Sequence, residues 1–286
     1  MAYTHIPEIS CIYTEKPLNT ISSNQLSTSE AHYEYEMILV TSGKAEVTID
    51  HKTYKLSAGS LVFISSMEHH YFTVTATPYI RFVVSMSSKL IMSYIKEPEL
   101  LSIFIQRPKD FYHVLHLNEQ TYKKIYHLFR MMESEYHACE IFHTSKCASL
   151  LCSTLIDLYR AYPGYFPNRG KSNITSAVVN AQRYVNEHYN HSLTLQEIAD
   201  ANYISRHALS LAFKDIVGIT FKEYLILFRI AEAKKLLVST DLSVAEISNE
   251  VGYINVNNFV KIFKERESIT PLQFRKTFSS STSKAL

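Results

Sequence analysis

The sequence is poor in the residues that break or stiffen a chain, with 6 Gly, 8 Pro and no Trp in 286 residues. That scarcity excludes a collagenous or low-complexity chain, and a hydrophobic content of 46% excludes a wholly disordered one. No apolar run approaches the length of a membrane span. The opening stretch MAYTHIPEISCIYTEK lacks the basic and apolar regions of a secretory signal, so we expect a cytoplasmic protein.

Chemistry-bearing motifs are also scarce. The four cysteines, at 11, 139, 147 and 152, form no CxxC pair, and we expect reduced, buried thiols. No P-loop, GxGxxG or nucleophile elbow is present, so we expect neither a cofactor nor an enzyme. The net charge of +2 is too small to predict nucleic-acid binding by itself.

The chain has the length of about two domains. Short apolar segments separated by polar turns predict strands near 35–40, 45–50, 54–56, 61–64, 71–75 and 80–84, as in a sandwich or barrel. Residues 118–136 and 143–161 then repeat apolar residues at helical spacing, as in a core or, as we favour, a subunit interface. We expect a sensor and dimerisation domain at 1–162 (barrel about 10–88, helices about 89–162), a linker at 163–172, a DNA-binding domain at 173–278 and a disordered tail at 279–286.

An internal repeat dominates the helical second half. Thr194 with Glu197 and Ser243 with Glu246 form S/T-x-x-E capping boxes 49 residues apart, each opening a short helix. Tyr203-Ile204-Ser205 then parallels Tyr253-Ile254-Asn255 at an offset of 50, and Ser205 and Asn255 are good N-caps for a second helix. The chain therefore twice encodes a helix, a tight turn and a helix, the pattern of a DNA-binding helix-turn-helix.

Residues 176–276 resemble the DNA-binding domain of the AraC/XylS family of bacterial transcription regulators. The resemblance is carried by Leu195, Ile198, Ala199, Ser205, Leu209, Phe213-Lys214, Gly218, Tyr224-Leu225, Arg229, Ala233, Leu236-Leu237, Ile247, Gly252-Tyr253, Phe259, Phe263-Lys264, Thr270-Pro271 and Phe274-Arg275. It implies that two helix-turn-helix units, joined by a helix at roughly 221–237, enter successive major grooves. This sequence departs from the family at Leu211, where a basic residue is common, and at Ser268, where glycine is usual.

The exposed face of each second helix supplies the expected DNA contacts. The predicted DNA-binding residues are Ser205, Arg206, His207, Ser210, Leu211 and Lys214 in the first unit, and Asn255, Val256, Asn257, Asn258, Lys261 and Lys264 in the second. The asparagines suit adenine edges, Lys261 suits guanine or phosphate, and Lys214 and Lys264 suit phosphate.

Residues 30–84 resemble the cupin-type sensor domain of the same regulators. The resemblance lies in the segments 32–43, 54–64 and 69–72, and it implies an effector site formed by His32, Glu34, Glu36 and His70. A metal site at Glu30, His32, Glu36 and His70 is the weaker alternative. Hydrogen-bonding roles, a pH-responsive histidine cluster or no ligand also remain open.

The predicted fold is therefore an α+β two-domain chain, a cupin-like barrel with C-terminal helices followed by an all-α double helix-turn-helix domain. The predicted function is a sequence-specific transcription regulator, favoured as an activator. Its expected partners are double-stranded DNA, a small effector, RNA polymerase and a second copy bound through helices at about 118–162. The alternatives are control by a protein partner without a small ligand and, least favoured, a metal-binding cupin enzyme.

Overall fold

The computed structural model describes residues 8–16, 21–22, 34–49, 51–66, 68–105, 107–108, 110–167 and 173–279. These residues form two compact units, one ending at Pro167 and the other beginning at Asn173. The first is an antiparallel sheet with helices and the second is entirely helical, which confirms the predicted fold class. Within the described ranges, no helix is long and apolar enough to cross a membrane.

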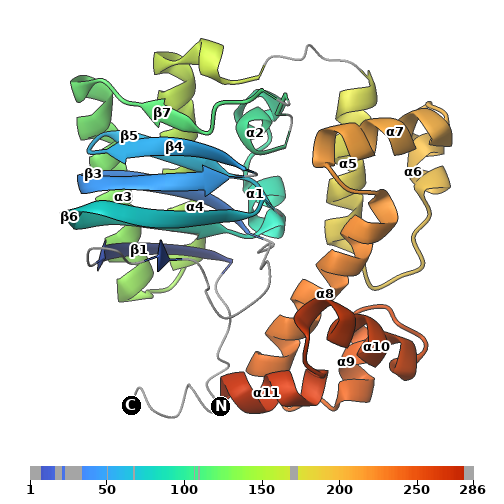
Figure 1. Cartoon of the computed structure of the whole chain (residues 1–286). Coiled ribbons are helices and arrows are strands. Elements are labelled where there is room, and N and C mark those ends of the chain that lie inside the picture. Colours follow the sequence, from blue (N-terminus) through green and yellow to red (C-terminus); the bar gives the residue numbers. More distant parts are fainter. Residues whose placement is uncertain are drawn as a thin grey trace. The chain divides into compact units, whose positions relative to one another are not determined.

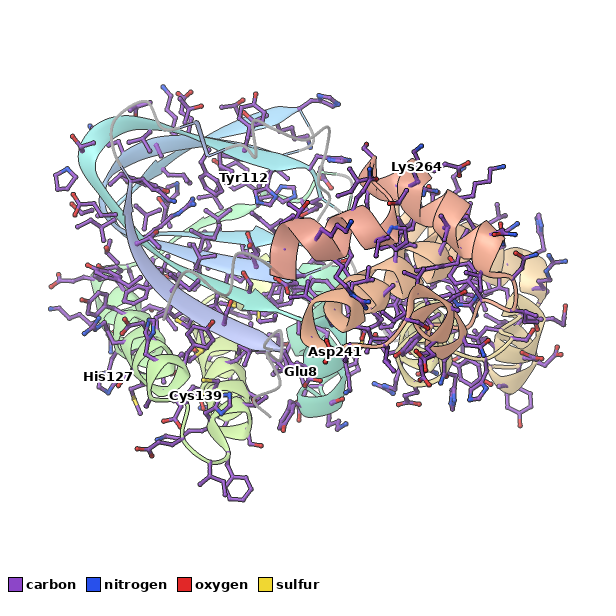
Figure 2. The ribbon with its side chains drawn as sticks, turned by 90° about the horizontal axis from the view of Figure 1, so that it is seen from below. Glu8, Tyr112, His127, Cys139, Asp241 and Lys264 are labelled. Atoms are coloured by element: carbon purple, nitrogen blue, oxygen red, sulfur yellow. The ribbon has the colours of Figure 1, made fainter. Side chains whose placement is uncertain are left out.

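The sheet of the first unit runs in the order β1-β6-β3-β5-β7, with β2 paired to β6 and β4 paired to β3 (Figure 1). Its strands are β1 (Ile9–Lys16), β2 (Ile21–Ser22), β3 (Tyr35–Ile49), β4 (Lys52–Ser57), β5 (Ser60–Ile64), β6 (His70–Met86) and β7 (Val114–His116). The sheet curves strongly (Figure 2), and one of its faces buries an apolar cluster that includes Ile38, Val47 and Phe72. This inner face is the part of the unit that could hold a ligand.

Two predicted strand breaks are wrong. The segments predicted at 35–40 and 45–50 belong to the single strand β3, and those at 71–75 and 80–84 belong to β6. The predicted turn at Thr41–Lys44 is instead a series of register shifts against β6. Gly43 adopts φ +77°, and a Cβ there would lie 2.5 Å from the carbonyl oxygen of Pro78. Glycine is therefore required because the two backbones approach too closely for a side chain.

Helices follow the sheet, with the short strand β7 among them. They are α1 (Ser88–Tyr94), α2 (Pro98–Ile105), α3 (Glu119–Ala138), α4 (His143–Ala161) and the 3₁₀ helix η1 (Pro163–Tyr165). In Figure 2, His127 on α3 and Cys139 in the turn after it lie outside the curve of the strands. Cys11 and Cys147 are buried as predicted, whereas Cys152 is only partly buried and Cys139, in the turn after α3, is exposed.

The apolar stripes of α3 and α4 are core rather than a surface available to a second copy. Ile125, Phe129 and Met132 of α3 are fully buried within the single chain, as are Leu151 and Leu155 of α4. Phe129 packs edge-to-face on Phe82 of β6, so the stripe faces the outer side of the sheet. The favoured interpretation of these stripes as a subunit interface is wrong, because helix–sheet packing uses the same spacing.

Part of the predicted linker packs against the first unit. The Tyr165 ring contacts Phe63 and Phe111, and its hydroxyl donates a 2.6 Å hydrogen bond to the carbonyl oxygen of Tyr112. Phe166 is buried against Tyr159. The described chain up to Pro167 thus belongs to the sheet unit. Residues 168–172, like the predicted tail from 280 onward, lie outside the described residues.

The second unit contains seven helices in its described range. They are α5 (Asn173–His188), α6 (Leu195–Ala201), α7 (Arg206–Val217), α8 (Phe221–Ser239), α9 (Val244–Glu250), α10 (Val256–Glu267) and α11 (Pro271–Ser279). The first half of α8 contributes Phe221, Leu225 and Phe228 to one core with α5, α6 and α7. Its second half contributes Ile230 and Leu237 to another core with α9, α10 and α11. One helix therefore serves both cores, as predicted for residues 221–237.

Candidate DNA-binding surface and ligand-binding sheet

Both predicted helix-turn-helix units form, and local hydrogen bonds define their helix starts. The Thr194 hydroxyl accepts from the Glu197 amide and the Glu197 carboxylate accepts from the Thr194 amide, which confirms the capping box of α6. Ser243 and Glu246 do the same for α9. Ser205 and Asn255 cap α7 and α10 through the amides of Ala208 and Asn258.

The two turns are not aligned as the sequence suggested. The amide of Ile204 donates to Ala199 and the amide of Tyr253 donates to Ser248, so Ile204 corresponds to Tyr253 at an offset of 49. Tyr203 corresponds to Gly252, and both residues have positive φ. The predicted pairing of Tyr203 with Tyr253 is therefore wrong, because the second turn contains one extra residue, Ile254.

The two turns expose two large apolar side chains, one in each helix-turn-helix unit, that were absent from the predicted site. Tyr203 is 96% exposed and Ile254 is 99% exposed, each just before the N-cap of a second helix. The sequence held a signal for this, since the offset of the repeat changes from 49 to 50 between the helices.

The second helices present matching exposed faces. His207, Leu211 and Lys214 on α7 correspond to Asn257, Lys261 and Lys264 on α10, and all six are exposed. Ser205, Arg206, Ser210, Asn255 and Asn258 are exposed as well, while Val256 is half-buried. Lys264 is labelled on the second unit in Figure 2. Leu209, Phe213, Phe259 and Phe263 are fully buried on the opposite faces.

The faces differ most at one equivalent position, where α7 carries Leu211 and α10 carries Lys261. Leu211 is 59% exposed and offers an apolar surface where α10 offers a charge. Lys261 lies 3.9 Å from the carboxylate of Glu265 and is highly exposed, so it remains available to a phosphate or a base.

Two arginines stabilise the helical unit through hydrogen bonds to backbone carbonyl oxygens. Arg229 of α8 donates to the carbonyl oxygens of Tyr189 and His191 and stacks on the Tyr253 ring at 5.3 Å. A Cβ on Gly252 would lie 2.9 Å from the Arg229 guanidinium, so this turn requires glycine. Arg275 of α11 donates to the carbonyl oxygens of Leu237 and Leu242, which ties α11 to the end of α8.

On the inner face of the sheet, two of the predicted effector residues meet. His70 Nε2 lies 3.5 Å from Glu36 Oε2, and the Ser85 hydroxyl donates to Glu36 Oε1 at 3.0 Å. Burial alone would lower the pKa of His70, but the hydrogen bond and negative charge of Glu36 outweigh it and raise that pKa. The pair joins opposite ends of long strands, because Glu36 begins β3 and His70 begins β6.

The other predicted effector and metal ligands precede β3 in the sequence. Glu34 precedes β3, and Glu30 and His32 lie outside the described residues. Among the residues that the structure describes, no group of three His, Cys, Asp or Glu side chains is arranged to hold a metal ion.

A second polar network on this unit was missed. Glu68 accepts from Arg107 Nη1 at 2.5 Å, and its other oxygen lies 3.1 Å from His113 Nε2, whose Nδ1 meets the Tyr54 hydroxyl at 3.0 Å. Burial would raise the pKa of Glu68, but Arg107 and His113 lower it to about 2. Because the residues of this network come from distant parts of the chain, no local sequence spacing predicts that they meet.

The sheet unit and the paired helix-turn-helix units both match known protein families. The AraC-like ligand binding domain matches residues 22–151, and a helix-turn-helix domain matches residues 198–277. The chain is 25% identical over 242 residues to the lactose operon transcription activator of Staphylococcus xylosus, covering 84% of this chain and 83% of that protein. It is 35% identical over 97 residues to the regulator YijO of Escherichia coli, a match spanning only 34% of each chain.

A solved structure shares the fold across both units. The unsaturated fatty acid-bound form of ToxT from Vibrio cholerae aligns with a TM-score of 0.54 at 14% identity, covering 95% of each chain. An antiparallel sheet unit of the ligand-binding type with two helix-turn-helix units defines a DNA-binding transcription regulator rather than an enzyme. The chain belongs to the AraC/XylS family of transcription regulators.

Proposed function

We propose that this regulator binds operators through α7 and α10, each placed in one of two successive major grooves. The observation that carries the proposal is the matched exposure of His207, Leu211 and Lys214 with Asn257, Lys261 and Lys264, on helices held by the shared helix α8. Successive major grooves on one side of DNA are separated by about 10 base pairs, so we expect two recognition blocks at that spacing.

Within each unit the predicted residues take different roles. Asn257 and Asn258 suit adenine edges, and His207 and Ser210 are permissive readers. Arg206, Lys214 and Lys264 suit phosphates and Lys261 suits guanine or phosphate, while Ser205 and Asn255 place their helices by capping them. Val256 and Leu211 suit thymine methyl groups. Tyr203 and Ile254 lie close enough to the N-termini of α7 and α10 in sequence to join the same surface.

We propose that the sheet unit senses a small effector on its inner face, where Glu36 and His70 meet. Glu34 and His32 belong to the same proposed site. The ToxT structure bound to a fatty acid supports an organic ligand in a unit of this fold. The effector can change DNA binding only by its difference in affinity between two states of the protein.

Dimerisation, contact with RNA polymerase, activation of transcription and a cytoplasmic location complete the proposal. With the apolar stripes of α3 and α4 buried, an interface at 118–162 must use their outer surface. The turn between those helices exposes Ile141 and Phe142, at 83% and 74%. The lactose operon activator supports the role of an activator.

The test is to recover host genomic fragments bound by the full-length protein at about 150 mM salt, where phosphate-only binding is weak. We expect enriched sites with two blocks about 10 base pairs apart. Asn257→Ala should relax the sequence of one block, and His207→Ala that of the other. Lys276→Ala, on α11, is the control. Recovery of no enriched sequence would contradict effector-independent operator binding.

A further inference from the structure

The inner face of the sheet buries a positive charge that has no counter-charge among the described residues. Arg81 of β6 is 7% exposed, and its Nε and Nη1 form no hydrogen bond with any described residue. Its guanidinium lies 4.2 Å from the centre of the Phe72 ring and 5.8 Å from that of Tyr79. Such cation–π contacts offset only part of the cost of burying a charge.

Two hydroxyls near Arg81 are also buried without a hydrogen bond from the described chain. They are the Tyr79 hydroxyl on the same strand and the Thr14 hydroxyl of β1. Thr14 lies directly opposite Arg81 in the β1–β6 register, so the two side chains share one face of the sheet. Burial raises the pKa of Tyr79, and the positive charge of Arg81, whose guanidinium lies 5.8 Å from the centre of the Tyr79 ring, opposes that effect.

The surroundings of this group are apolar. Val40 lies opposite Arg81 on β3, and Val40, Tyr79, Phe72 and Ile38 belong to the same buried cluster. In an apolar environment an unmatched polar atom is costly, so three neighbouring side chains whose donors find no partner among the described residues are unlike ordinary core packing. Such a departure is expected where a site is shaped for a ligand.

We propose that the inner face binds the carboxylate of a small organic acid, with Arg81 as its counter-charge and Thr14 and Tyr79 as further hydrogen-bond donors. The planar guanidinium matches the two oxygens of a carboxylate. One buried positive charge with two neutral hydroxyls balances a monoanion, whereas a phosphate dianion would leave a buried negative charge. The apolar neighbours suit an aliphatic or aromatic remainder.

This inference rests on the proposed sensing role of the sheet unit and gives that role a ligand class. In this proposal the carboxylate of the ligand contacts Arg81 and does not contact Glu36 or His70. The side chains of Glu36 and His70 already contact each other. Those two residues would face other polar groups of the ligand.

The test compares acids with uncharged molecules of the same shape. Thermal unfolding of the full-length protein is followed with hexanoate and benzoate, and with hexanamide and benzamide, at constant ionic strength. We expect the acids to raise Tm by a few degrees through binding to the folded state, and the amides to have little effect. An equal response to both members of each pair, or no response to either acid, would overturn the proposal.

Variants then assign the response to the site. Arg81→Met should abolish the acid-specific rise in Tm, Arg81→Lys should keep part of it, and the exposed control Arg160→Met should keep all of it. Tyr79→Phe and Thr14→Val should each weaken acid binding by about tenfold, the effect of losing one hydrogen bond to a charged group. An acid response in Arg81→Met equal to that of the parent would overturn the assignment.

A second readout separates ligand binding from a merely structural role of Arg81. Without added acid, Arg81→Met should unfold at the same temperature as the parent or higher, since it removes a buried charge that has no counter-charge in the described part of the chain. A clearly lower Tm would show that the guanidinium holds the fold together. If operator binding responds to a neutral compound while the acids have no effect, the sensing role stands and only this inference fails.

Discussion

Two equivalent residues end the helices α7 and α10 with the same backbone conformation but different side chains. Gly218 ends α7 with φ +87°, and Ser268 ends α10 with φ +62°. Glycine adopts this left-handed conformation without strain, whereas serine must tolerate a Cβ close to the following carbonyl. The departure from the family pattern at Ser268 therefore has a conformational cost in this chain.

Exchanging these residues should move stability in opposite directions. We expect Ser268→Gly to raise the free energy of unfolding by about 0.5–1 kcal/mol, and Gly218→Ser to lower it by a similar amount. Nothing lies within 4 Å of a Cβ built on Gly218, so strain alone sets the effect. Denaturant unfolding measures both variants, and a loss of stability in Ser268→Gly would contradict the argument.

The network around Glu68 should make the sheet unit sensitive to acid. The pKa of Glu68 falls from 4.5 to about 2 on folding, so its ionised form stabilises the native state. That stabilisation is fully present above about pH 4.5 and is lost as the pH falls through about 2. Glu68→Gln, which removes the carboxylate that Arg107 and His113 contact, should cost about 3–5 kcal/mol at pH 7.

Unfolding free energies at pH 7 and pH 3 measure this effect. The difference between Glu68→Gln and the parent should shrink at the lower pH, because at pH 3 Glu68 is protonated in the unfolded parent but still ionised in the folded one, which favours unfolding. Glu119→Gln is the control, since its exposed pair with Lys123 contributes about 0–1 kcal/mol. A difference that does not change with pH would contradict the role of the Glu68 charge.

At the scale of elements, α8 links the two helix-turn-helix units into one folding unit. Its residues enter both apolar cores, and Tyr189 packs against both as well. If one core unfolds, half of α8 loses its packing. The other core contains the remaining half of α8, so we expect it to be destabilised as well.

Phe213→Ala tests this link. Phe213 is fully buried in the first core, so we expect a loss of about 3–5 kcal/mol. Because α8 is shared, amide hydrogens of α10 should lose protection together with those of α7. Hydrogen exchange resolves the two helices, and unchanged protection of α10 would show that the units unfold separately.

Sequence patterns predicted the features that depend on near neighbours. The caps at Thr194, Ser205, Ser243 and Asn255 form because their hydrogen bonds join residues three apart. The continuity of β3 and β6 was not predictable in the same way, since polar residues at 41–44 look like a turn until a partner strand pairs with them. The same limit applies to the stripes of α3 and α4, whose spacing suits a core or an interface equally.

The candidate site shows the same division. Glu36 and His70 were predicted together through resemblance, and the fold brings them into contact across 34 residues of chain. Arg81 was missed because a single arginine within the run YIRFVVS has no spacing partner. The sequence did show that Arg81 is a charged residue within a mostly apolar strand segment. Only the register of β1 and β6 showed that Thr14 lies opposite it.

At the scale of the whole molecule, the chain combines a sheet unit of the ligand-binding type with two helix-turn-helix units that share α8, which we propose holds α7 and α10 at a fixed separation. The fixed separation of α7 and α10 is the central proposal, because it requires one particular spacing of the two operator blocks. A flexible link between the two helix-turn-helix units would allow the protein to bind operators of several block spacings with similar affinity.

The measurement that tests this claim most directly is the affinity of the purified protein for one selected operator with 0, 5 or 10 base pairs inserted between its two blocks. Five base pairs turn one block to the opposite side of the DNA, so affinity should fall at least about 100-fold, toward that of a single block. Ten inserted base pairs return both blocks to the same side of the DNA but place them further apart than α7 and α10, so binding should stay weak. Equal affinity for all three operators would contradict a pair of readers fixed by α8.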